Sequence, residues 1–177
     1  LYMDDILDMI DWASDISVDT PKKTTINANI PTTRQVIEFT DRYMKDTARF
    51  TGYDASEGAL YVLFMLTLAM HPMGPSIFSV DSFDHALNPR LAKKMIQVFC
   101  EQIIQNNKHV FLTTHNPLVL DGLDLQNDDI RLFAVDRDSN GYAQIRRISV
   151  SQELIDEGLP LSRLWISGRL GGVPSLL

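Results

Sequence analysis

The 177-residue sequence has almost no cysteine, no long hydrophobic run and no excess of positive charge. Cys100 is the only cysteine, so an internal disulfide is excluded and a reducing cytoplasm is the expected location. The longest apolar run, residues 60–70, is too short to cross a bilayer, so no membrane association is expected. A formal net charge of −7 argues against nucleic-acid binding driven by overall charge, although a local basic patch or a partner could still supply it.

The sequence also lacks a signal peptide and a phosphate-binding glycine loop. Its first residues are acidic rather than basic, unlike a secretory leader. No segment matches G-x-x-x-x-G-K-[ST], and the Gly171-Gly172 pair lies near the C-terminal end. Because the chain begins with Leu1 rather than Met, we expect it to be part of a longer protein.

Hydrophobic spacing in the first 75 residues predicts mostly helix. Residues 1–12 and 34–50 have helical spacing, and residues 15–33 suggest short strands or loop. Residues 59–70 are apolar on nearly every face, which predicts a buried helix.

The second part of the sequence alternates between strand and helix patterns. Strands are expected at 76–80 and 109–114 with a helix at 91–105 between them, and this order predicts two parallel strands. A hairpin is expected at 129–148 with Asn140-Gly141 at its turn, followed by two short helical pieces. Asp81 and His115 follow the two parallel strands, so both should emerge at the same sheet edge, where α/β folds bind ligands.

Three polar features are candidates for a functional site, and each also has an ordinary structural explanation. Ser56-Glu57-Gly58 precedes the apolar helix and could simply cap it. Asp81 could form a turn, and His115 could be solvated or structurally bonded. Cys100 lies among apolar residues and is expected to be a small buried side chain rather than a reactive thiol.

In this order the three features resemble the C-terminal half of an ABC-type ATPase head of the RecF/SMC/OLD branch. That branch carries a signature motif, a Walker B strand, a D-loop and a switch histidine. Within it the sequence is most similar to the AAA-type ATPases of the Septu and retron-associated anti-phage systems. The resemblance covers about residues 54–174 and includes "FDHALNPRL", "FLTTHNPLVLDGL" and "LSRLWISGRLGG".

The resemblance implies an α/β fold: an ABC-ATPase-like layered domain with a mostly parallel sheet, flanking helices and a C-terminal hairpin. Residues 1–53 would form a helical, lid-like segment, and 54–177 would be the C-terminal half of the ATPase domain. The P-loop part would lie N-terminal to this chain.

The resemblance also implies roles for individual residues with ATP and Mg²⁺ as cofactors. Asp81 would hold Mg²⁺ and His115 would contact the γ-phosphate. The signature and D-loop residues would reach the nucleotide of the other protomer in a head-to-head dimer; these are Ser56, Glu57, Gly58 and, within Ala86-Leu87-Asn88, Asn88.

One position departs from the family pattern. Ser82 stands where the family places the glutamate that polarises the attacking water, and a serine cannot act as that base at neutral pH. Asp84 is the expected substitute, since Glu57 belongs to the signature motif that acts in trans. ATP hydrolysis is therefore expected to be slow.

The expected function is an ATPase subunit of an anti-phage defence complex that dimerises around ATP and controls a partner nuclease. The sequence carries no DxD cluster or TOPRIM-like extension after the ATPase half, so an HNH-type nuclease would supply DNA cleavage, and a reverse transcriptase–nucleic acid complex is a further candidate partner. Two alternatives stay open: a DNA-repair or chromosome-associated ATPase of the same branch, and a non-hydrolysing scaffold locked by ATP, which Ser82 favours.

Overall fold

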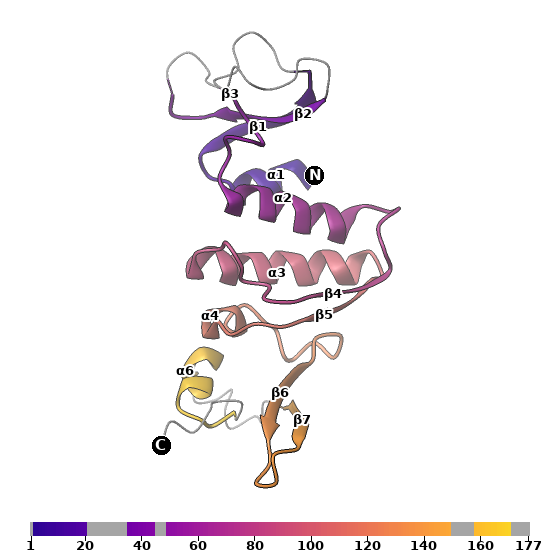
Figure 1. The fold of residues 1–177 in the computed structure, drawn as a ribbon, viewed down its shortest axis with the longest axis vertical. Coiled ribbons are helices and arrows are strands. Elements are labelled where there is room, and N and C mark those ends of the chain that lie inside the picture. The colour runs from indigo at the N-terminus through magenta and orange to yellow at the C-terminus, as the bar shows by residue number, and fades with distance from the viewer. Residues whose placement is uncertain (1, 21–34, 45–48, 150–157, 171–177) are drawn as a thin grey trace. The chain divides into compact units, whose positions relative to one another are not determined.

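The computed structural model describes residues 2–20, 35–44, 49–149 and 158–170 (Figure 1). The chain divides into two units, Leu1–Gly74 and Pro75–Leu177. None of the helices in these described ranges is long and apolar enough to cross a membrane.

The described part of the first unit contains two helices and a small antiparallel sheet. Helix α1 (Tyr2–Met9) is followed by strands β1 (Ala13–Asp19), β2 (Val36–Asp41) and β3 (Arg49–Thr51), and then by helix α2 (Glu57–Met70). The strands are ordered β1-β2-β3, and both pairs are antiparallel. Trp12 packs against Phe39 and Phe50 with ring centroids 5.5 and 6.0 Å apart, so an aromatic cluster anchors this sheet.

The helix predicted at 34–50 is wrong over the residues that the structure describes there, 35–44 and 49–50, and the described part of the 1–53 segment is not predominantly helical. Residues 36–41 form the central strand of the sheet and 49–51 form an edge strand. The β-branched and aromatic residues of β2 favour strand. Glu38 is the reason that the strand was missed. A glutamate is expected to be exposed, but Glu38 is only 2% exposed, so the sequence does not show the alternation of apolar and polar residues expected of a strand.

Helix α2 is buried along one side rather than all round. Ser56 caps its N-terminus, with Oγ accepting the Ala59 N–H at 3.2 Å. The side chains facing the interior are Ala59, Val62, Met65, Leu66 and Ala69. Phe64 is 60% exposed, so the prediction of a fully buried helix is wrong on that face.

The second unit opens with the strand–helix–strand arrangement that the sequence predicted. Strand β4 (Ile77–Val80) pairs in parallel with β5 (His109–Leu112), and helix α3 (Pro89–Gln105) connects them. Figure 1 shows α3 running alongside the two strands. Phe99 of α3 packs against Phe78 and Phe83 with ring centroids 6.4 and 5.3 Å apart, which holds the helix on one face of the pair. On the other face Ile77, Ser79, His109 and Phe111 are exposed.

Among the residues described after β5, the second unit has a hairpin between two short helices. Helix α4 (Pro117–Leu120) packs on α3 and on α6 (Leu161–Ile166). Strands β6 (Leu132–Arg137) and β7 (Ala143–Ile148) are antiparallel, and Gly141 at the turn has φ +85°, which confirms the predicted hairpin. Of the two helical pieces expected after it, the part at 150–157 lies outside the described residues.

The strands of the described residues form three separate small sheets, of which only the β4–β5 pair is parallel. The mostly parallel layered sheet predicted from the sequence is therefore wrong. The fold class is mixed α/β. One βαβ unit is present, with parallel β4 and β5, and the other described strands pair antiparallel.

Candidate functional site

The candidate site lies where β4 and β5 end. In the parallel register Val80 is paired with Leu112, so the chain leaves both strands at the same edge, as the sequence predicted. The two segments stay bonded beyond the strands: Thr113 N–H donates to Val80 O at 3.1 Å, and Phe83 N–H donates to Thr113 O at 2.9 Å. We call Asp81, Ser82, Asp84, Thr113, Thr114 and His115 the strand-end cluster.

Thr113 connects the two segments through its side chain. Its Oγ1 donates a hydrogen bond to Asp81 Oδ1 and accepts one from the Ser82 N–H at 2.9 Å. One hydroxyl therefore fixes both the Asp81 carboxylate and the backbone that follows it.

Thr114 makes the same kind of connection to the second aspartate. Its Oγ1 donates to Asp84 Oδ1 at 2.6 Å and accepts the Asn116 N–H at 3.1 Å. Asp84 and Thr114 are half-buried, whereas Asp81 and Thr113 are exposed. The two threonines were not singled out in the sequence, although their place directly before His115 was a usable signal.

Ser82 and His115 complete the cluster, with Ser82 half-buried and His115 exposed. Ser82 has φ +55°, a left-handed conformation that is uncommon for a residue with a side chain. This conformation turns the chain sharply between the two aspartates. The His115 side chain is exposed and makes no hydrogen bond within the described residues, so it is available to a ligand.

The remaining predicted residues are at helix starts. Ser56, Glu57 and Gly58 belong to the first unit and open α2, so the ordinary explanation of Ser56 as an N-cap is confirmed. Asn88 caps α3, with Oδ1 accepting the Leu91 N–H at 2.9 Å. Neither cap excludes a nucleotide contact, because the first N–H groups of a helix attract phosphate.

The cluster could hold Mg²⁺ only together with other ligands. No group of three or more His, Cys, Asp or Glu side chains with metal-ligand geometry is present in the described part of the chain. Asp81 alone supplies one exposed carboxylate. Mg²⁺ in nucleotide sites is held by one or two carboxylates plus phosphates and waters, so the residues present fit that ion.

Cys100 is not part of a reactive site. Burial, assisted by the carboxylate of Glu101, raises the pKa of the Cys100 thiol to about 11. A thiol of this kind is protonated at neutral pH and is a poor nucleophile, which agrees with the structural role expected for it.

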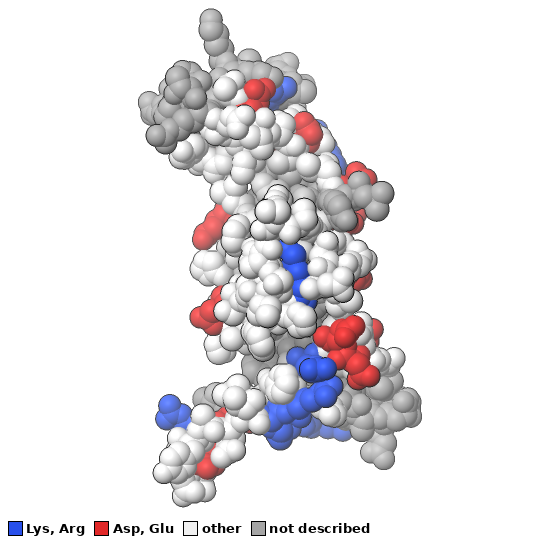
Figure 2. All heavy atoms as spheres, turned by 90° about the vertical axis from the view of Figure 1, so that its right-hand side faces the viewer, with Lys and Arg blue, Asp and Glu red and all other residues white. Residues whose placement is uncertain are grey.

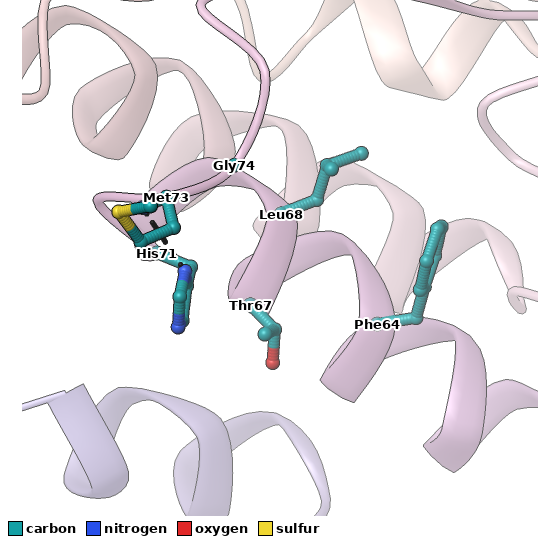
Figure 3. A pocket seen from close by; sticks show the side chains of 6 residues that line it. All are labelled: Phe64, Thr67, Leu68, His71, Met73 and Gly74. Atoms are coloured by element: carbon teal, nitrogen blue, oxygen red, sulfur yellow. Dashed lines mark hydrogen bonds between the residues drawn. The ribbon is translucent and has the colours of Figure 1, made fainter.

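A separate cavity of about 220 Å³ lies at the C-terminal end of α2 (Figure 3). Its lining is mostly apolar: Phe64, Thr67, Leu68, His71, Met73 and Gly74. His71 Nδ1 accepts the Met73 N–H at 3.1 Å, so this ring nitrogen is used to hold the turn. None of the predicted site residues lines this cavity.

Exposed arginines gather in the last third of the chain. Six of the ten arginines lie between residues 131 and 169, and each is exposed: Arg131, Arg137, Arg146, Arg147, Arg163 and Arg169. We call these six side chains the arginine surface. Figure 2 shows basic side chains gathered at the lower end of the picture, level with the hairpin of Figure 1. These exposed arginines are the candidates for the local basic patch that the net charge left open.

The comparison with known protein families assigns the chain to a class of AAA domains. Residues 11–121 match the family described as "AAA domain, putative AbiEii toxin, Type IV TA system", and the chain belongs to this family. The match includes Ser56, Asp81, Asp84 and His115.

The fold is also similar to a solved structure. That structure comes from work on ATP-driven dimerization and DNA-stimulated activation of SMC ATPases, with a TM-score of 0.52 and 10% identity. The similarity covers 88% of this chain and 87% of the other. At this identity it concerns the fold alone. No curated protein matches the sequence.

Proposed function

We propose that this chain binds ATP·Mg²⁺ at the strand-end cluster and dimerises head to head around the nucleotide. The observation that carries the proposal is the hydrogen-bonded edge at which Asp81 follows β4 and the Thr113–His115 segment follows β5. In a parallel sheet such an edge is where ligands bind. Membership of an ATPase family supports ATP as that ligand.

The residues of the cluster take distinct roles in this proposal. Asp81 holds Mg²⁺, which offsets the charge of the triphosphate. Asp84 accepts the proton of the attacking water, and His115 contacts the γ-phosphate through its exposed ring. A phosphate-binding loop N-terminal to this chain completes the site, which makes residues 54–177 the C-terminal half of the ATPase domain. Because Ser82 replaces the usual carboxylate, turnover is slow.

Dimerisation uses the two capped helix starts. Ser56, Glu57 and Gly58 reach the γ-phosphate held by the other protomer, and Asn88 lies at the interface between the two. The exposed position of Ser56 and Asn88 supports this role. The Oγ of Ser56 already accepts the Ala59 N–H, so its hydroxyl proton is the group available to a phosphate oxygen.

Two variants of Ser56 test the proposal in the full-length protein. Ser56→Arg places a bulky cation in the trans contact and should abolish ATP-dependent dimerisation measured by light scattering. Ser56→Asp keeps a good N-cap but sets a negative charge against the phosphate, so it should also abolish dimerisation with little loss of stability. Ser56→Asn is the matched control, since it caps equally well without charge. Unchanged dimerisation in both charged variants refutes the trans role.

The proposed biological role is control of a toxic nuclease in anti-phage defence, in the manner of Septu-like or retron-associated ATPases. The family description, which names a toxin of a toxin–antitoxin system, supports a role in controlled toxicity. An HNH-type nuclease should co-purify with the full-length protein in the presence of ATP. Absence of any nuclease from the purified complex contradicts this role and leaves the ATPase proposal standing.

A second candidate function is a DNA-responsive ATPase of the repair or chromosome-associated kind, and the arginine surface favours it. On the outer face of the hairpin Phe133, Val135 and Ile145 are 51%, 64% and 72% exposed, and arginine with exposed apolar side chains suits nucleic-acid contacts. Double replacement of Arg137 and Arg147 by Glu should then remove any stimulation of ATP hydrolysis by DNA. Lys93→Glu, an exposed charge of α3, is the control. If DNA does not stimulate the wild type, this candidate fails.

A third candidate, a scaffold that ATP locks without hydrolysis, is supported by Ser82 alone. ATP binding and dimerisation with no measurable phosphate release distinguish it from the other two.

A further inference from the structure

We infer that Thr113 and Thr114 are positioning residues that set the two carboxylates of the strand-end cluster for ATP·Mg²⁺. The inference rests on the proposed function. It adds two residues to the site, neither of which touches the nucleotide.

The geometry gives each threonine one aspartate. Thr113 Oγ1 donates to Asp81 Oδ1, and Thr114 Oγ1 donates to Asp84 Oδ1 at 2.6 Å. Each hydroxyl has a single proton, so this donation commits it fully to the carboxylate. The second oxygen of each carboxylate, Oδ2, makes no hydrogen bond with any residue that the structure describes, so it is left for a cation or a water.

Both hydroxyls are themselves oriented by backbone N–H groups. The Ser82 N–H donates to Thr113 Oγ1 at 2.9 Å, and the Asn116 N–H donates to Thr114 Oγ1 at 3.1 Å. Each threonine therefore stands between a fixed backbone donor and a carboxylate, an arrangement that selects one rotamer of the aspartate. Free aspartates on an exposed turn would sample several rotamers, and ordering them on each binding event would weaken the metal site.

The left-handed turn at Ser82 makes this support necessary. With φ +55° at Ser82, the chain changes direction directly after Asp81. The bond from the Ser82 N–H to Thr113 Oγ1 and the one from the Phe83 N–H to Thr113 O at 2.9 Å hold that turn to β5. A methyl group in place of the Thr113 hydroxyl removes the acceptor for Ser82 and the donor for Asp81 at once.

The test compares valine and serine at both positions in the full-length protein. Thr113→Val keeps the shape of the side chain but not its hydroxyl, and Mn²⁺ affinity measured by electron paramagnetic resonance with a non-hydrolysable ATP analogue should fall about 10–100-fold, as supporting residues of metal sites typically show. Thr113→Ser restores the hydroxyl and should recover most of the affinity.

Thr114→Val should act on the other carboxylate. The Mn²⁺ affinity and the KM for ATP should stay close to wild type while kcat falls about 10-fold or more, and Thr114→Ser should recover kcat. This division between metal affinity at Thr113 and kcat at Thr114 is not produced by a general loss of structure.

Ser162→Ala is the matched control within the same unit. Ser162 Oγ donates to Asp121 Oδ2 at 2.8 Å, so the variant loses a hydroxyl–carboxylate bond of the same kind outside the cluster. Its free energy of unfolding in urea should fall about as much as that of the threonine-to-valine variants, while its Mn²⁺ affinity should stay unchanged. A crystal structure of nucleotide-free Thr113→Val provides a readout without activity, and Asp81 should adopt a different rotamer in it.

The outcomes distinguish a failure of the proposed function from a failure of the positioning role of the two threonines. If wild type binds neither ATP nor Mn²⁺, the proposed function fails. If wild type binds both but Thr113→Val and Thr114→Val match it in affinity and kcat, the positioning role is overturned and the site remains. Equal losses in the valine and serine variants also overturn it, because the hydroxyl would then not be the active feature.

Discussion

Replacing Asp84 by asparagine should separate its proton-accepting role from its structural one. Asp84 Oδ1 accepts the Thr114 hydroxyl at 2.6 Å, and the amide oxygen of asparagine can accept the same bond. The position of the side chain should therefore be kept. An amide, however, cannot take a proton from water at neutral pH.

The size of the effect follows from this difference. General-base assistance is typically worth about 10²–10⁴-fold, or roughly 3–5 kcal/mol of activation free energy. Asp84→Asn should lower kcat by that factor and leave KM and stability near wild type. Asp84→Ala should lower kcat at least as far. It should also destabilise the fold by about 1–2 kcal/mol, because the half-buried Thr114 hydroxyl loses its hydrogen-bond acceptor.

Ser82→Glu provides the converse change. A carboxylate directly after Asp81 restores the family pattern, so turnover should rise above that of wild type, which is expected below about 10 per second, the median for enzymes. Ser82→Gln is the matched control: it has the same size and the same cost at φ +55° but no carboxylate. The glutamate variant should be the faster of the two.

The assay is phosphate release by the full-length protein at saturating ATP and Mg²⁺, with nucleotide affinity measured separately by titration. If Asp84→Asn hydrolyses ATP as fast as wild type, Asp84 is not the base and the scaffold candidate gains support. If Ser82→Gln accelerates hydrolysis as much as Ser82→Glu, the gain does not come from a carboxylate.

Three further predictions concern packing and chemistry away from the cluster. Arg49 Nη1 lies 3.3 Å from Oε2 of Glu38, whose side chain is 1% exposed. Arg49→Met leaves this buried carboxylate without its cation, so the free energy of unfolding in urea should fall by about 3 kcal/mol. Adding Glu38→Leu to that variant should recover most of this stability. Gly122→Ala should lower the free energy of unfolding by about 1–3 kcal/mol, because its Cβ would lie 2.5 Å from the backbone oxygen of Lys93. A lower melting temperature measured by circular dichroism checks this. Burial disfavours the thiolate of Cys100, so this cysteine should react with iodoacetamide about 100-fold more slowly at pH 8 than a thiol with the usual pKa of 9.0. Its reaction rate should keep rising up to about pH 11.

The parts of the fold that the sequence predicted are those with strong local signals. The helical spacing of the apolar residues in 91–105, within α3, and Asn140-Gly141 in the hairpin are signals of this kind. The parallel pairing of β4 and β5 followed from the crossover between them. Each of these signals acts within a few residues or follows from chain connectivity.

The parts that escaped prediction depend on contacts between distant segments. Strand β2 is stabilised by pairing on both sides, with β1 and β3, and its buried Glu38 needs Arg49 from the neighbouring strand. The threonine bonds join residues 32 and 30 positions apart. Sequence spacing indicated Asp81 and His115 as strand ends, but it carried no information on which side chain would bond to which.

The exposed face of the β4–β5 pair affects the behaviour of the chain in concentrated solution. Ile77 and Phe111, on adjacent strands, are 65% and 71% exposed there, whereas parallel sheets are normally covered on both faces. Strands whose outer edges lack a partner within the described residues also offer free backbone groups to another molecule. Repulsion from the net charge of −7 opposes such association, and salt screens that repulsion. Reversible clustering of the 177-residue chain by itself should therefore increase with ionic strength.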